Sequence, residues 1–119
     1  MTLPLTTFNT TFLEIPEIEE TFYTAPAGYS QIVTMCQVSN VSTTDSGLVS
    51  LNLNRGLDVI QQLNEYEIPP GEVLCVYGAG QGSLILEPGD FISVFRSPGE
   101  GVTLNITMSV IGTLIAKTC

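Results

Sequence analysis

The feature that most constrains this chain is a strict alternation of apolar and polar residues near its C-terminal end. Between Val102 and Val110 every second residue is apolar, and the residues between them are Thr, Asn, Thr and Ser. This two-residue period is typical of a β-strand with one buried face, because a helix would distribute the same apolar residues around its axis. The run Val49–Asn54 alternates in the same way and stops at Arg55-Gly56. The pattern therefore predicts a chain built from strands.

Turns rich in glycine and proline divide the rest of the chain into pieces of strand length. In the turn Pro88-Gly89-Asp90, Pro restricts φ, Gly accepts a positive φ and Asp can bond its neighbouring backbone. Short strands separated by regular turns are typical of an antiparallel sandwich or barrel. The expected strands are Thr21–Thr24, Gln31–Ser39, Leu48–Asn54, Asp58–Ile60, Glu72–Tyr77, Ser83–Leu86, Phe91–Arg96 and Val102–Ile111.

The segment Leu57–Tyr66 admits a short helix as an alternative to a strand. Its residues Val59 and Ile60 are β-branched and favour the extended form, and Pro69-Pro70 ends either element. We therefore expect an all-β fold, an antiparallel β-sandwich that is jelly-roll-like, with an immunoglobulin-like sandwich as the alternative. The Trp and paired Cys that mark antibody domains are missing.

The length of 119 residues suits one domain with its own core. We expect residues 21–119 to form a single β-sandwich domain and residues 1–20 to form an extended N-terminal arm or an edge strand. In the first segment Phe8 and Phe12 are interleaved with Thr and followed by acidic residues around Glu19. Such a segment suits an arm laid along a neighbouring chain, and equally an ordinary first strand of the same domain.

Charge narrows the class of partner. Twelve Asp and Glu against three Lys and Arg give a net charge of −9, whereas a groove for nucleic acid needs clustered cations. Only 13% of the residues are charged and 44% are apolar, which indicates a folded chain. The first residues lack a basic region and an unbroken apolar stretch, and no run is apolar enough for a membrane helix. We expect no signal peptide, no nucleic acid partner and no membrane contact.

No arrangement of residues predicts catalysis. The chain has no His, so a thiol nucleophile has no imidazole base and a zinc site lacks a common ligand. Cys36 lies in an apolar run, as expected of a small buried side chain. The nearest carboxylate pairs, Glu65 with Glu67 and Glu87 with Asp90, lie at strand ends or turns, where solvated carboxylates are common. We therefore expect a protein that is not an enzyme and has no catalytic residues, metal site or cofactor.

Several predicted strands carry large apolar residues on both faces. Simple alternation places Val33 and Met35 on the face opposite Cys36. A sheet face in water does not usually hold so many apolar side chains, and burying them is worth about 25 cal/mol per Å². We therefore expect a homo-oligomer, with a trimer as the favoured form. The candidate interface residues are Leu3, Leu5, Phe8, Phe12, Val33, Met35, Leu74, Val76, Phe91 and Phe95.

Two segments resemble the small β-sandwich virion proteins of tailed bacteriophages, including those of cyanophages. One is Tyr23–Asn40 with its Pro-Ala-Gly turn, and the other is Leu86–Val94 with its Pro-Gly-Asp turn. The resemblance spans residues 21 to 112 and consists of turn-and-strand patterns. It implies that each turn joins two strands and that Asn40 ends a strand.

The resemblance implies a non-enzymatic virion structural protein, first of all a capsid decoration or cement protein that stabilises the particle through protein–protein contacts. A tail, neck or baseplate component is the alternative within this class. Its partners are then other virion proteins, such as major capsid or tail proteins, and its location is the virion after synthesis in the host cytoplasm. A host-attachment or carbohydrate-binding module is the competing class, since the four Tyr residues offer rings on which a sugar can stack.

Overall fold

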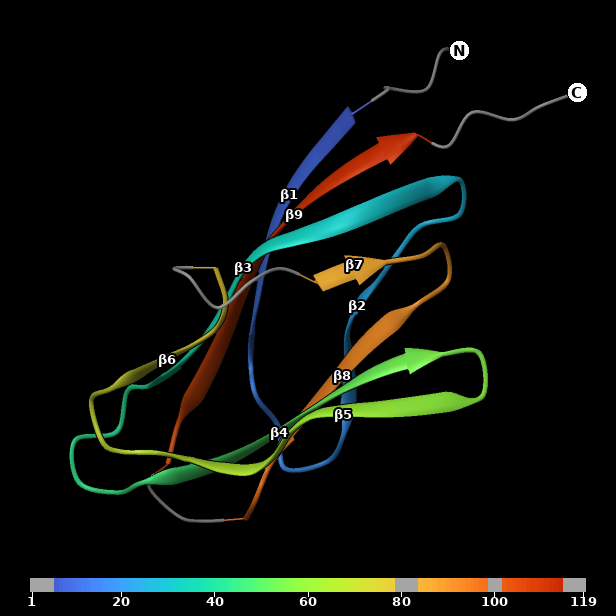
Figure 1. Cartoon of the computed structure of the whole chain (residues 1–119). Helices are drawn as coiled ribbons and strands as arrows, with labels where there is room; N and C mark the ends of the chain where they lie inside the picture. Colours follow the sequence, from blue (N-terminus) through green and yellow to red (C-terminus); the bar gives the residue numbers. More distant parts are fainter. Residues whose placement is uncertain (1–5, 79–83, 99–101, 115–119) are drawn as a thin grey trace, which may run out of the picture.

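A computed structural model of the chain describes residues 6–78, 84–98 and 102–114 (Figure 1). All the regular structure in these residues is β-strand, so the segment Leu57–Tyr66 contributes to a strand and the helical alternative is wrong. The strands are β1 (Thr6–Glu14), β2 (Glu20–Thr24), β3 (Tyr29–Asn40), β4 (Gly47–Arg55), β5 (Asp58–Ile68), β6 (Val73–Tyr77), β7 (Leu84–Leu86), β8 (Phe91–Arg96) and β9 (Leu104–Leu114).

The strands form two antiparallel sheets packed face to face, which confirms the predicted all-β sandwich (Figure 1). The first, here called sheet A, has the order β1-β9-β3-β6, and β7 also pairs with β3. The second, sheet B, has the order β2-β8-β4-β5. Strand β6 pairs with the segment 36–39 of β3 and β7 with the segment 31–33. Strands β6 and β7 thus lie one after the other on the same side of β3.

Strand β1 belongs to sheet A of the same chain. It pairs with β9 from Thr6 opposite Thr113 to Glu14 opposite Asn105, without a register shift. It stands at the end of the sheet order, so its second edge has no strand beside it among the described residues. Residues 6–14 are therefore an edge strand of this sandwich.

The core lies between the sheets and consists of the inward residues of the alternating runs. These side chains are no more than 3% exposed, and truncating one costs about 2–5 kcal/mol in a typical core. The largest contributions of β9 and β4 to it are Leu104, Ile106, Met108, Val110, Val49, Leu51 and Leu53.

A bulge in β3 decides which way its residues face. The pairing of β3 with β9 shifts between Val33 and Met35, so Thr34 is an extra residue in β3. An extra residue reverses the alternation beyond it, and Val33 and Cys36 therefore face the same way. They are 0% and 1% exposed, both in the core. The expectation that Val33 lies on an outer face opposite Cys36 is corrected by this bulge.

Candidate interaction surface

The outer face of sheet A carries a row of isoleucines. Ile32 of β3 lies opposite Ile85 of β7 on one side and Ile111 of β9 on the other. Ile32 is 43% exposed and Ile85 is 57% exposed, while Ile111 is partly buried. On β1, Phe8 is the residue in register with Ile111. We refer to Ile32, Ile85 and Ile111 as the isoleucine row.

Charge is almost absent from sheet A. The five strands of this sheet contain one charged residue, Glu14, at the end of β1. Toward the other end of the sheet, Phe12 is 80% exposed and lies opposite Thr107, while Val73 is 57% exposed and lies opposite Ser39. The outer face of sheet A is therefore a surface of hydroxyl, amide and apolar groups.

The free edge of β1 borders this face. Natural proteins commonly block an edge strand with Pro, Lys or a bulge. In β1, whose sequence is TTFNTTFLE, there is no Pro and no Lys, and its register with β9 is unbroken. The edge thus offers backbone donors and acceptors in a regular array.

The interface residues expected from the sequence are spread over several environments. Phe12 and Met35 lie on strands of sheet A, exposed and partly buried respectively. Leu74 and Val76 are partly buried and pack against the core, and Val33 is inside it. The others are Phe91 and Phe95, partly buried on β8 of sheet B, Phe8, described by its position in β1, and Leu3 and Leu5, which lie outside the described residues.

Ile32 and Ile85 were not among the expected interface residues. Simple alternation puts Ile32 on the same side as Cys36, which is in the core, and only the bulge at Thr34 separates the two. Ile85 belongs to the candidate surface because it pairs with Ile32 on the neighbouring strand. In the sequence, both faces of β3 carry apolar residues. This pattern indicates that a second face of the strand is buried, but it does not show which residues form that face.

On sheet B, the outward polar residues of β4 and β8 are buried in hydrogen bonds within the chain, whereas β5 is largely exposed. The Asn52 amide donates to the carboxylate of Glu19 at 3.0 Å, and the Ser93 hydroxyl donates to the same oxygen at 2.5 Å. Asn54 donates to Ser93 at 3.0 Å. The hydrogen bonds from Ser93 and Asn52 lower the pKa of Glu19 below its ordinary value, despite some burial. This network ties the β1–β2 connection to β4 and β8.

One of the two carboxylate pairs considered for acid–base chemistry is an ion-paired turn. Arg55 lies 2.7 Å from an oxygen of Asp90 and 3.6 Å from one of Glu87. Burial raises the pKa of Asp90, but the hydrogen bonds from Arg55 and from the backbone N–H of Glu87 outweigh burial and hold it below its ordinary value. Both carboxylates therefore serve the turn between β7 and β8.

The thiol of Cys36 is poorly suited to nucleophilic chemistry. Burial, with a smaller contribution from Cys75, raises the pKa of Cys36 to about 12, so the thiol stays protonated at neutral pH. Among the described residues, no three Cys, Asp or Glu side chains come close enough to hold a metal ion. No helix long and apolar enough to cross a membrane occurs in the described part of the chain.

Comparison of the chain with models of known protein families and with curated proteins finds no match. The case for a functional surface therefore depends on the geometry of the chain itself. The most distinctive element of that geometry is a sheet face with a single charged residue, Glu14, which carries the isoleucine row and has an open strand edge beside it.

Proposed function

We propose that the chain is a non-enzymatic structural protein that assembles with copies of itself through the outer face of sheet A. The observation that carries this proposal is the isoleucine row on a sheet with one charged residue, Glu14. Chains with a net charge of −9 repel one another, so a contact face with little charge favours self-association. Sheet A provides such a face, and burying its exposed apolar groups favours association.

The edge of β1 favours a second copy as the occupant. An antiparallel pair of identical strands is self-complementary about a two-fold axis, so each copy offers the other the same edge. The edge adjoins the outer face of sheet A, and a partner that covers the face also reaches the backbone groups of β1. We propose a homo-oligomer built on this continuous surface. The two-fold contact gives a dimer, whereas the trimer expected from the sequence needs a contact between two different surfaces.

We also propose that the sandwich is a jelly roll rather than an immunoglobulin-like fold. With β6 and β7 counted as one strand position beside β3, each sheet has four strand positions. The chain crosses from sheet A to sheet B between β1 and β2, between β3 and β4 and between β7 and β8. It crosses from sheet B to sheet A between β2 and β3, between β5 and β6 and between β8 and β9. Repeated crossing between two four-stranded sheets is typical of jelly rolls, which occur in viral capsid and lectin domains.

Within this class we propose a virion structural protein, first of all a capsid decoration or cement protein, with a tail, neck or baseplate component as the alternative. The support is the resemblance of the segments Tyr23–Asn40 and Leu86–Val94 to phage virion proteins. The Pro-Ala-Gly turn joins β2 to β3, the Pro-Gly-Asp turn joins β7 to β8, and β3 ends at Asn40, in line with that resemblance. The partners are then other virion proteins, and the location is the virion.

The carbohydrate-binding alternative needs exposed rings beside polar loops. Of the four Tyr residues only Tyr66 is strongly exposed, at 49%. Tyr29 is buried, the Tyr23 hydroxyl donates to Gln31, and the Tyr77 hydroxyl donates to Gln62. The arrangement of the rings favours the structural role.

Light scattering after size exclusion of the full chain tests the proposal. We expect an oligomer at micromolar concentration, and a monomer throughout a dilution series would refute assembly through sheet A. Density for the chain in a purified phage particle tests the virion role. Glycan binding that is lost in Tyr66→Ala would instead favour the attachment module.

A further inference from the structure

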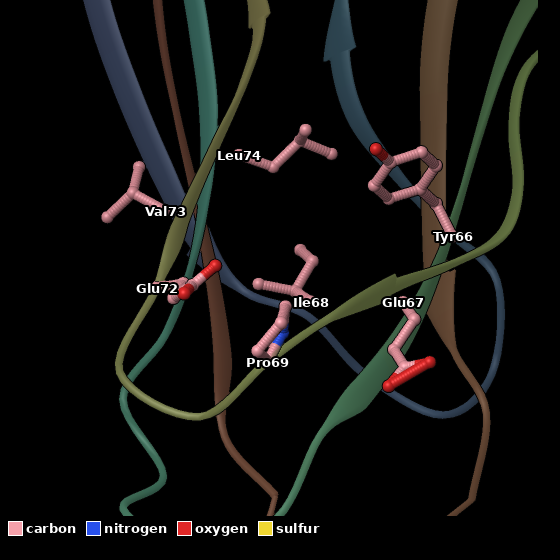
Figure 2. A pocket seen from close by; sticks show the side chains of 7 residues that line it. All are labelled: Tyr66, Glu67, Ile68, Pro69, Glu72, Val73 and Leu74. Carbon is pink, nitrogen blue, oxygen red and sulfur yellow. The ribbon is translucent and has the colours of Figure 1, made fainter.

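A pocket of about 310 Å³ lies where the chain crosses from β5 of sheet B to β6 of sheet A (Figure 2). It is at the other end of β3 from the isoleucine row, since Val73 at its rim is in register with Ser39 while Ile85 is in register with Ile32. Its volume is at the low end for ligand pockets, which run from about 300 to 1,000 Å³. The space suits one side chain or one small group.

Part of the lining of the pocket is apolar. Ile68, which is 1% exposed, closes it toward the core, and Leu74 extends from β6 toward the ring of Tyr66 on β5 (Figure 2). The Tyr66 side chain is 49% exposed, so its ring is available to a ligand that enters between the two strands. A hydrocarbon chain that enters here contacts two aliphatic side chains and an aromatic ring.

The rim of the pocket is acidic. Glu67 and Glu72 both line it and both are exposed. Neither carboxylate makes a hydrogen bond or an ion pair within the described part of the chain, whereas Arg55 pairs with Asp90 and Arg96 pairs with Glu17. Two uncompensated negative charges thus stand beside an apolar slot with an aromatic wall.

We propose that this pocket binds an arginine side chain of a different protein in the assembly. The aliphatic stem of arginine packs on apolar surface, its guanidinium stacks on an aromatic ring, and it forms charge-assisted hydrogen bonds with carboxylates. Arginine fits better than lysine because its planar, weakly hydrated group combines stacking with bonding to carboxylates. The two arginines of this chain are already ion-paired, which makes another protein the source. The proposal does not depend on self-assembly through sheet A.

Titration of the full-length chain with blocked arginine, followed by amide NMR shifts, tests the proposal. The probe is N-acetyl-arginine amide at low salt, and the control ligand is N-acetyl-citrulline amide, which has nearly the same shape without the charge. We expect saturable shifts in residues 66–74 with a millimolar dissociation constant, weakening as salt is added. Equal binding of citrulline, or shifts that map to another part of the chain, would overturn the proposal.

Variants separate local recognition from net charge. Glu67→Gln with Glu72→Gln is expected to weaken arginine binding about three- to tenfold, as for the loss of two exposed charge pairs. The matched control, Glu14→Gln with Glu20→Gln, removes the same charge at β1 and β2, on the opposite edges of the two sheets, and is expected to leave binding unchanged. If both double variants weaken binding equally, only net charge matters and the pocket is not the site.

Removing the ring tests the aromatic wall. Tyr66→Leu keeps apolar volume and is expected to weaken binding about two- to fivefold, the effect of losing one exposed cation–π contact. An unchanged dissociation constant in this variant would contradict stacking on Tyr66. The dispersion of the same spectra shows whether each variant is folded. Light scattering on the same samples reports self-assembly separately, so failure of one proposal is distinguishable from failure of the other.

Discussion

Replacing the two exposed isoleucines of the isoleucine row should weaken self-association while leaving the fold intact. The variant Ile32→Thr with Ile85→Thr keeps β-branched side chains, which retain a high strand propensity. In the monomer Ile32 is 43% and Ile85 57% exposed, so the substitutions add little polar surface to the core. The free energy of unfolding should fall by about 1–2 kcal/mol, because the buried half of each side chain loses part of its hydrocarbon, and the fold should be retained.

The expected loss of association energy follows from the exposed area. Full burial of an isoleucine side chain is worth about 1.5–3 kcal/mol, so the half that each of these residues leaves exposed is worth about 1 kcal/mol. Two copies bring four such side chains to one contact, and Thr retains part of the hydrocarbon, which leaves a loss of about 3 kcal/mol per contact. Since 1.4 kcal/mol is a factor of ten, the dissociation constant should rise about 100-fold. The translational entropy lost on association is the same for both proteins and cancels in the comparison.

Sedimentation velocity over a dilution series of wild type and variant measures this shift. The control is Ile18→Thr with Val59→Thr, which changes residues that are 82% and 63% exposed but lie outside sheet A. Circular dichroism and denaturant melts show that each protein is folded. An unchanged dissociation constant in the sheet A variant, or an equal rise in the control, would refute the assignment of the interface to the isoleucine row.

Three further predictions concern the fold. Gly78→Ala should lower the free energy of unfolding by about 2 kcal/mol, because Gly78 has a φ of 92° and an added Cβ would lie 2.9 Å from the carbonyl oxygen of Thr34. Gly28→Ala, with a φ of 87° and no atom within 4 Å of its added Cβ, should cost less in the same urea melt, and a larger cost would contradict the close approach to Thr34. Met108→Ala should cost about 2–5 kcal/mol by the same measurement because Met108 is 0% exposed, and a loss below this range would place Met108 outside the packed core. The folded-state pKa of Glu19 lies below its ordinary value of 4.5, so its contribution to stability is present above that pH and declines as the pH falls through the folded-state pKa. The stability difference between wild type and Glu19→Gln should therefore shrink in acid, and a difference independent of pH would count against the network around Glu19.

The strands were predictable because their signals are local. The alternation in β9 and β4 predicts the inward apolar face of each strand without reference to any partner strand, and those residues are in the core. The polar residues of β9 between Asn105 and Ser109 are partly exposed, but Ser50, Asn52 and Asn54 of β4 are buried, so the solvated face expected for β4 is wrong. The Pro88-Gly89-Asp90 turn was equally readable, since restricted φ and a positive φ are properties of single residues. The sandwich class follows from the number and spacing of such elements.

The candidate surfaces were less predictable because they depend on pairing between distant segments. The isoleucine row joins β3, β7 and β9, whose residues meet only through register. The arginine pocket joins Tyr66 and Leu74, which are near in sequence but belong to different sheets. Local pattern shows that a residue is apolar but does not show which segment will cover it.

The bulge at Thr34 marks the limit of the sequence pattern most clearly. The order of apolar residues determined that β3 is a strand with two apolar faces, because the two-residue period belongs to the extended backbone. Only pairing with β9 decided that Val33 turns inward and Ile32 outward, since one extra residue against a continuous partner reverses the alternation. The backbone of Thr34 also lies close to Gly78, directly after the end of β6, so the bulge packs against the end of the neighbouring strand. Which residues of β3 face the core is therefore decided by the tertiary structure, because it depends on how three strands pack together.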